Sequence, residues 1–126
     1  MKVSFDFDDT LDRSSVQEYA KELVHRGLEV WICTRRLSNE DAENPRWNDD
    51  LYQVAREVGI KKENIHFCGM LDKHTFFKDN DFVWHLDDDW IEIRMINERT
   101  KTIGISVFGN TTWKNKCNKK LGFPKG

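Results

Sequence analysis

Apolar residues gather in five short runs along the chain, separated by stretches of mostly polar sequence. Each run is rich in β-branched and aromatic residues, which is typical of buried strands. The runs are 2–7 (KVSFDF), 28–34 (LEVWICT), 64–69 (NIHFCG), 81–86 (DFVWHL) and 101–108 (KTIGISVF). The pattern therefore predicts five strands.

The stretch between the first two runs repeats apolar residues at the spacing of one helix face. Ser15 followed by Glu18 forms a capping box, and Gly27 suits a helix C-terminus. The apolar stripe consists of Val16, Tyr19, Ala20, Leu23 and Val24. We expect a helix that begins at the Ser15 cap and ends before Gly27.

Three further helices are predicted. One begins at an Asn48 cap and ends at Gly59, with a stripe of Leu51, Val54, Ala55 and Val58. A short segment near 72–78 follows the third run. In the last, Asp89 and Glu92 cap a helix that runs to about Asn97.

Strands that alternate with helices predict the α/β class. We expect a three-layer α/β/α Rossmann-like domain with a mainly parallel five-stranded sheet. A length of 126 residues suits a single domain, 1–126. No apolar run approaches the roughly 20 residues of a membrane span, and the N-terminus lacks a signal-peptide core. The three cysteines have no CxxC spacing and are interpreted as reduced, cytoplasmic thiols.

This layout gathers polar residues at one edge of the sheet. In open α/β sheets, sites form outside the carboxyl ends of the strands. Asp6 and Asp8, Thr34, the turn 68–73 and the acids at 87–89 all fall at such ends. We therefore expect these four segments to converge on one site.

Clustered carboxylates favour a metal ion. Asp6 and Asp8 are two residues apart and can face the same side, and Asp87 and Asp88 arrive from another strand. Such acids repel one another unless a cation lies among them. Oxygen ligands without His or Cys suit Mg²⁺, which lets an anionic carboxylate approach a phosphate. A carboxylate can then serve as the nucleophile and form an aspartyl-phosphate.

Four motifs in order resemble those of the haloacid dehalogenase-like (HAD) phosphohydrolases. DFDDTL (6–11) resembles the first motif, an Asp-x-Asp-x-Thr pattern after an apolar strand. WICT, which ends in Thr34, is similar to the second. Lys73 fits the third, and FVWHLDD, ending in Asp87 and Asp88, is similar to the fourth. The resemblance covers residues 3 to about 92.

The resemblance implies a role for each matched residue. Asp6 would be the nucleophile, and Asp8 would protonate the leaving oxygen and then activate water. Thr34 and the backbone N–H of Arg35 would bind a phosphoryl oxygen. Lys73 would balance the charge of the nucleophile and the phosphate.

The resemblance also implies how Mg²⁺ would be held. Asp87 and Asp88 would complete the site with the Asp6 carboxylate and the Asp8 backbone carbonyl, and Asp88 is favoured over Asp87 as the direct ligand. Two departures stand out. Asp9 lies where many family members carry Gly, and Lys78 competes with Lys73 for the third motif.

The chain has no room for the cap domain that usually closes a HAD site. Only residues 12–27 separate the first motif from the second strand. A capless member would have an open site, able to take a phosphate on a large substrate such as a nucleic-acid end or a protein side chain. It would also take small phosphates, as a monomer or a small homo-oligomer in which a neighbouring subunit excludes water. The longest insert, 35–47, could form a partial lid.

Charge is unevenly spread. The net charge is −2, but residues 110–126 carry five Lys and no acid. This basic tail also carries Trp113 and Phe123, a mixture that suits single-stranded nucleic acid. The alternative interpretation is a solvated helix with Trp113 docked on the core. Arg35 and Arg36 could likewise grip a second phosphate or simply lie on the surface.

The sequence thus predicts a Mg²⁺-dependent phosphatase acting through an aspartyl-phosphate on Asp6. One alternative is a phosphatase specific for nucleotides or nucleic-acid 3′ or 5′ ends. Another is a non-catalytic phosphate-binding or scaffold module. A two-component receiver domain is excluded, because Cys68 and Gly69 stand where its phosphorylated Asp would be. A P-loop kinase is excluded because no GxxxxGK[ST] is present.

Overall fold

A five-stranded parallel sheet forms the centre of the protein, seen in a computed structural model that describes residues 1–108 and 112–124. The strands are β1 (Lys2–Phe5), β2 (Glu29–Thr34), β3 (Ile65–Phe67), β4 (Trp84–Asp87) and β5 (Ile103–Ser106). Their order is β3-β2-β1-β4-β5, and every neighbouring pair is parallel. The predicted α/β class and five-stranded sheet are confirmed.

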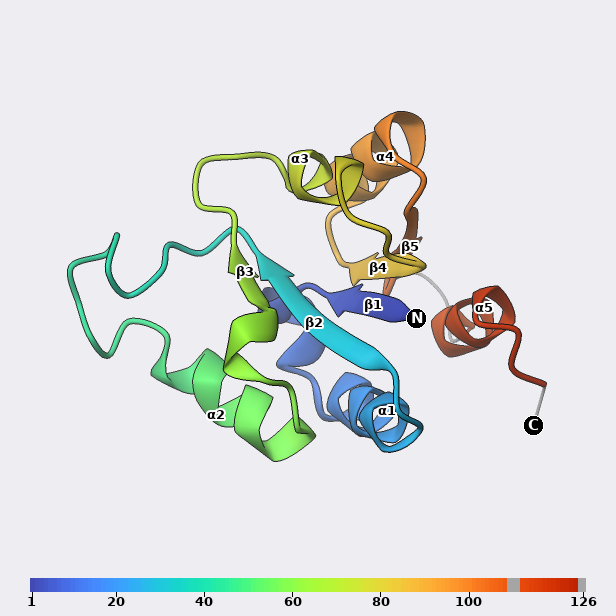
Figure 1. The fold of residues 1–126 in the computed structure, drawn as a ribbon, viewed down its shortest axis with the longest axis horizontal. Helices are drawn as coiled ribbons and strands as arrows, with labels where there is room; N and C mark the ends of the chain where they lie inside the picture. The colour runs from blue at the N-terminus through green and yellow to red at the C-terminus, as the bar shows by residue number, and fades with distance from the viewer. Residues whose placement is uncertain (109–111, 125–126) are drawn as a thin grey trace.

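Helices cover both faces of this sheet (Figure 1). The helices are α1 (Ser14–His25), α2 (Asp49–Val58), α3 (Lys73–Lys78), α4 (Trp90–Arg99) and α5 (Trp113–Lys120), with short helical turns at Phe7–Leu11 and Lys62–Asn64. The larger core cluster lies under α1, α2 and α5, and the smaller one under α3 and α4. The arrangement is therefore three layers, α/β/α.

Side chains along β1 and β4 alternate between the two faces, as strand geometry requires. Val3 and Phe5 are fully buried in the larger core, where Phe5 packs edge-to-face against Trp84 at a centroid distance of 5.3 Å. The opposite face of the same strands carries the buried polar residues Ser4 and His85. Two buried polar groups at the sheet centre mark this face as the one that builds a site.

The start of α1 departs from the expected cap, whereas that of α4 does not. Helix α1 begins at Ser14 with Arg13 at the N-cap position, so Ser15 lies inside the helix and its predicted capping box is wrong. The tight turn Phe7–Leu11 ends two residues earlier, and Arg13 is the residue left in the extended conformation that a cap needs. Asp89 caps α4 as predicted, since its carboxylate accepts from the N–H groups of Ile91 and Glu92.

The described part of the basic tail is a docked helix. Trp113 packs edge-to-face on Tyr19 at 5.4 Å, Cys117 is fully buried, and Phe123 lies beneath the guanidinium of Arg26 at 4.4 Å. Both tail aromatics thus contact the protein itself. Residues 110, 111, 125 and 126 of the predicted tail lie outside the described residues. No helix in the described ranges is both long and apolar enough to cross a membrane.

Candidate functional site

Asp6 lies at the carboxyl end of the central strand. Its N–H donates to the carbonyl of Leu86 at 2.9 Å, which extends the pairing of β1 with β4 by one residue, and only 6% of Asp6 is exposed. The chain then turns sharply, because Asp8 is extended and Asp9 adopts a left-handed φ of 60°. Thr10 closes the turn, with its hydroxyl 3.4 Å from the second oxygen of Asp6.

Lys73 reaches this carboxylate from the first residue of α3. Its Nζ lies 2.7 Å from an oxygen of Asp6 and 2.7 Å from an oxygen of Asp87, and the side chain is 2% exposed. The competing Lys78 lies at the exposed end of α3 and forms no ion pair with the described residues. Lys73 is therefore the lysine that the fold brings to Asp6.

Burial and pairing set the proton affinities of these groups. Burial alone would lower the pKa of Lys73, but the carboxylates of Asp6 and Asp87 outweigh it and raise that pKa. Burial raises the pKa of Asp6 well above its ordinary value, against the effect of Lys73. The pKa of Asp87 is lowered, because hydrogen bonds from His85 and Lys73 outweigh its burial. Asp87 thus stays ionised more readily than Asp6. Asp6 is the carboxyl whose charge depends most on a further cation.

Asp87 is held by a buried chain of hydrogen bonds that runs through His85 to Ser4. The Nε2 of His85 lies 2.7 Å from an Asp87 oxygen, and its Nδ1 lies 2.9 Å from the hydroxyl of Ser4. Burial lowers the pKa of His85, so the neutral ring donates to Asp87 and accepts from Ser4. Sequence reasoning did not identify Ser4. A signal for this chain of hydrogen bonds was present in the sequence. His85 and Asp87 are two residues apart on one strand, which puts both on the same face of the sheet.

Three carboxylates form a possible metal centre. Asp6, Asp87 and Asp88 each offer an oxygen, and these oxygens lie within 4.8 Å of one another. A donor set made only of carboxylate oxygens fits a hard divalent cation. Both Asp87 oxygens already accept hydrogen bonds, from Lys73, His85 and the N–H of Asp89. Asp88 is half-buried and accepts no hydrogen bond from a lysine or histidine among the described residues, so it is the carboxylate most available to an ion.

Thr34 ends β2 at the same edge. Its buried hydroxyl accepts the N–H of Arg36 at 3.1 Å, which fixes the start of the insert beside the site. The guanidinium of Arg36 donates to both oxygens of Asp8, at 2.8 and 3.0 Å, and to both oxygens of Asp50, at 2.7 and 2.9 Å. The Asp8 carboxylate is therefore directed to Arg36 and lies outside the carboxylate cluster formed by the described residues.

Arg35 binds protein carboxylates as well. Its guanidinium lies 2.9 Å from Asp72 and 2.8 Å from Glu92. Glu92, which is 6% exposed, also accepts the N–H of Lys73 at 3.2 Å. The Glu92 side chain therefore anchors the start of α3 instead of completing a capping box with Asp89. Only the three-dimensional fold could show this, because Glu92 and Lys73 are 19 residues apart.

Two cysteines lie in contact next to the site. The Sγ atoms of Cys33 and Cys68 are 3.5 Å apart, and neither forms a disulfide. The hydrogen bond from Cys33 outweighs burial and lowers the pKa of Cys68 to about 5, with help from His66. Burial raises the pKa of Cys33. Cys68 is therefore the thiol of the pair that loses its proton more readily.

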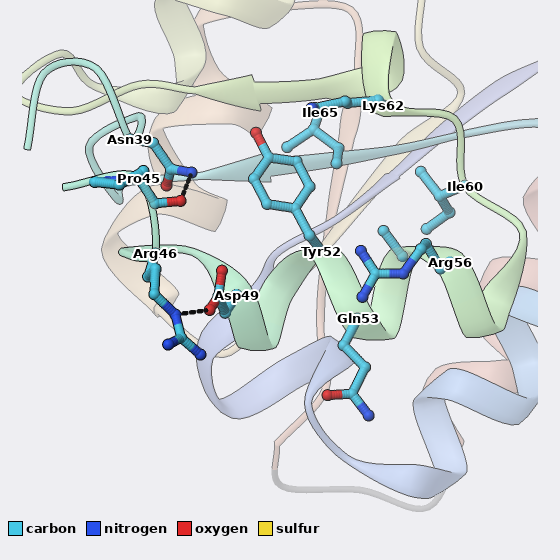
Figure 2. A pocket seen from close by; sticks show the side chains of 11 residues that line it. Asn39, Pro45, Arg46, Asp49, Tyr52, Gln53, Arg56, Ile60, Lys62 and Ile65 are labelled. Atoms are coloured by element: carbon cyan, nitrogen blue, oxygen red, sulfur yellow. Dashed lines mark hydrogen bonds and ion pairs between the residues drawn. The ribbon is translucent and has the colours of Figure 1, made fainter.

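A separate cavity of about 770 Å³ lies between the insert, α2 and β3 (Figure 2). The rings and chains around it include Tyr52, Arg56 and Lys62, and Arg46 at its mouth is paired with Asp49 at 2.9 Å. None of the site residues described above lines this cavity. The carboxylate cluster therefore lies apart from this cavity.

The position of the site follows from the order of the strands. From β1 the chain adds β2 and β3 on one side and β4 and β5 on the other. Asp6 directly follows β1 and Asp87 ends β4, so the two acids flank the point where this direction reverses. Ligands in open α/β sheets bind at such switch points.

A scan against models of protein families finds no match for the chain, and a search of curated proteins finds none. The chemistry of the site therefore has to be inferred from its residues.

Proposed function

We propose that the protein is a Mg²⁺-dependent phosphomonoester hydrolase of the HAD type, acting through an aspartyl-phosphate on Asp6. The observation that carries this proposal is the buried Lys73 ammonium, which lies 2.7 Å from both Asp6 and Asp87 beside a cluster of three carboxylates. A structural ion pair needs one lysine and one acid. Four ionisable groups concentrated at a sheet switch point favour catalysis.

Asp6 supplies the nucleophile in this proposal. A carboxylate oxygen of Asp6 forms a bond to phosphorus as the bond from phosphorus to the leaving oxygen breaks. Water then attacks the same phosphorus, releases phosphate and regenerates the Asp6 carboxylate. Lys73 favours the anionic form of Asp6 against the effect of burial, and the Thr34 hydroxyl can donate to a phosphoryl oxygen.

A divalent cation bound by Asp6, Asp87 and Asp88 would supply charge neutralisation, since an anionic nucleophile and a phosphate repel each other. The donor set fits Mg²⁺, with the remaining ligands coming from water and phosphate. Binding of the cation would also favour the ionised form of Asp6, against burial, which raises the pKa of this carboxyl.

Asp8 is the proposed proton carrier. It would protonate the leaving oxygen and later take a proton from the attacking water. Both of its oxygens contact Arg36, so this role requires the Asp8 side chain to leave that guanidinium when substrate arrives. Asp8 is more than half exposed, which leaves it free to rotate.

Turnover of p-nitrophenyl phosphate tests the proposal. We expect hydrolysis that EDTA abolishes and Mg²⁺ restores, and a folded Asp6→Asn variant without activity. Asp12→Asn is the matched control, because Asp12 is an exposed acid close to the same turn and outside the cluster. Wild-type activity in Asp6→Asn would remove the nucleophile assignment. A wild-type protein inactive on a broad phosphomonoester panel would favour a phosphate-binding module instead.

A further inference from the structure

Exposed large apolar side chains gather at one end of the molecule. Among the described residues these side chains are Met1, Leu37, Trp47, Met70, Leu71, Trp90, Ile91 and Phe108. Seven of the eight follow the carboxyl ends of β2, β3, β4 and β5, and Met1 alone lies at the other end. We call these seven residues the apolar rim.

The apolar rim lies at the same end of the sheet as the carboxylate cluster. Trp90 follows Asp88 by two residues, and Leu71 precedes Lys73 by two. The insert and the turn after β3 touch each other, since a Cβ on Gly69 would lie 3.3 Å from the side chain of Leu37. These segments therefore carry apolar side chains on the same edge of the sheet as the proposed phosphate position.

Their exposure is unusual in degree. Met70 is 90% exposed, and Trp90 and Leu71 are exposed by about two thirds. Scattered apolar residues are normal on a surface, but a gathered set marks an interaction site. Trp and Met are also residue types enriched in protein–protein interfaces. The rim therefore has the composition of a surface that contacts a macromolecule.

The same end of the molecule is acidic. Within the described residues, the connections that follow the strands (6–13, 35–48, 68–72, 88–89 and 107–108) hold ten acidic residues and four arginines, a net charge of −6. The described connections at the opposite end (26–28, 59–64, 79–83, 100–102 and 121–124) hold four basic residues and three acidic ones. The rim thus favours a cationic partner and disfavours a polyanion.

The arginines at this end do not offset that charge for an incoming phosphate backbone. Arg35 binds Asp72 and Glu92, and Arg36 binds Asp8 and Asp50. Arg46 is paired with Asp49. Nucleic acids bind mainly through cations that replace the counterions of many phosphates. The fourth arginine, Arg13, lies over the ring of Phe108 at 4.4 Å. A surface with three of its four arginines already bound to carboxylates is poorly suited to that mode of binding.

We propose that the substrate is another protein, with the phosphate carried by a hydroxyl side chain in a segment of basic and apolar residues. This inference rests on the proposed phosphatase function and names its substrate class. Apolar side chains of the segment dock on Trp47, Trp90 and their neighbours, and its Lys and Arg side chains face the acidic connections. The phosphate enters the carboxylate site between them, where Asp88 is the half-buried group.

A second copy of the chain fits this end less well. A symmetric dimer through the rim would place one net charge of −6 directly against another. The charge distribution therefore favours a basic partner over self-association.

Matched phosphopeptides provide the first test. One peptide has Lys, Arg and Leu around the phosphorylated residue, a second has Asp and Glu in place of the Lys and Arg, and a 3′- or 5′-phosphorylated oligonucleotide has similar length. We expect kcat/KM for the basic peptide to exceed both others by about tenfold or more. The advantage should shrink between about 0.05 and about 0.5 M ionic strength, because salt screens charge.

Rim variants provide the second test. In Trp47→Ala and Trp90→Ala, kcat/KM for the basic peptide should fall about tenfold further than that for p-nitrophenyl phosphate. Arg56→Ala is the control, because Arg56 is exposed, forms no ion pair with the described residues and belongs to α2, which carries none of the rim residues. It should leave the ratio of the two values at that of the wild type.

The outcomes separate this inference from the function on which it rests. Turnover of p-nitrophenyl phosphate with equal or better turnover of the oligonucleotide or the acidic peptide overturns the protein substrate and leaves the phosphatase standing. A rim-dependent dimer, seen by sedimentation and dissociated by Trp47→Ala, also overturns it. If the wild-type protein hydrolyses neither p-nitrophenyl phosphate nor any of the phosphorylated substrates, both proposals are wrong.

Discussion

The Nζ of Lys73 lies 2.7 Å from a carboxylate oxygen of Asp6, although 67 residues separate them in the sequence. The lysine comes from the start of a short helix, and the acid from the end of the central strand. Lys73 is 2% exposed, so this ammonium has no water to replace its partners. The contact therefore supports both the stability of the fold and the charge of the proposed nucleophile.

Replacement of Lys73 by Met should destabilise the protein strongly. The change leaves Asp6 and Asp87 buried without their shared cation, which typically costs about 3–5 kcal/mol of the free energy of unfolding. Urea denaturation measures the loss, and p-nitrophenyl phosphate turnover should disappear. Lys78→Met is the control, since Lys78 is exposed at the end of the same helix. Equal losses in the two variants would contradict the special position of Lys73.

Mg²⁺ should stabilise the protein independently of any activity. An ion held only by the native state adds about 2.7 kcal/mol at a concentration of 100 Kd. We expect Mg²⁺ to raise Tm in the wild type and to raise it much less in Asp88→Asn. Asp89→Asn should respond like the wild type, because Asn caps a helix as well as Asp does and Asp89 lies outside the carboxylate cluster. A shift that survives in Asp88→Asn would exclude Asp88 as a ligand.

Cys68 should titrate far below an ordinary thiol. Its pKa is lowered to about 5, first by the Cys33 hydrogen bond, so ultraviolet absorbance should show one thiolate at neutral pH. The folded state then binds fewer protons than the unfolded state between that value and the unfolded pKa near 9. This contribution to stability is present above pH 9 and is lost as pH falls through about 5.

Cys33→Ala is the variant that tests the cause of this shift. Without the thiol that donates to Cys68, the thiolate loses its main hydrogen bond and the titration should move toward higher pH. Cys117→Ala is the control variant. Cys117 lies in the larger core, away from the pair, and burial raises its pKa, so its removal should leave the low-pH titration unchanged. An unchanged low-pH titration in Cys33→Ala would show that another group stabilises the thiolate.

Asn48 should hold the insert 35–48 in place. Its buried amide donates to the carbonyl of Leu37 and to the side chain of Asn39, both at 2.9 Å. Asn48→Ala leaves these acceptors unsatisfied, at a cost of about 1–3 kcal/mol in chemical denaturation. Asn44→Ala breaks one exposed bond, to Arg46, which water can replace, and should cost much less. Limited proteolysis in the insert should also accelerate only in Asn48→Ala.

Periodicity was sufficient to predict the fold. Each of the five apolar runs overlaps a strand, although β4 extends one residue beyond its run, to Asp87. The second helix ends at Gly59, which has a φ of 97° as a helix-terminating glycine should. The runs were longer than the strands because side-chain pattern does not register where backbone pairing stops. Phe7, for example, is buried like a strand residue but belongs to the turn after β1.

The site was predictable only in part. Asp6, Thr34, Lys73 and the 87–88 pair could be expected together, because parallel strands bring their carboxyl ends to one edge. The attachment of Asp8 to Arg36 could not, since nothing in local sequence fixes the path of a 14-residue connection. Buried Ser4 was missed for a related reason, because its partner His85 comes from a strand 81 residues away.

The strand order also sets when the site can exist during synthesis. Asp6 emerges with the first strand, but the strand that carries Asp87 pairs with β1 only after some 80 further residues have been made. Until then the central strand has one open edge, and neither Lys73 nor a second carboxylate is in place. Long-range pairing of this kind forms late and slowly. In the nascent chain Asp6 would therefore lack Lys73 and Asp87 beside it. The proposed nucleophile would become active only when folding is nearly complete.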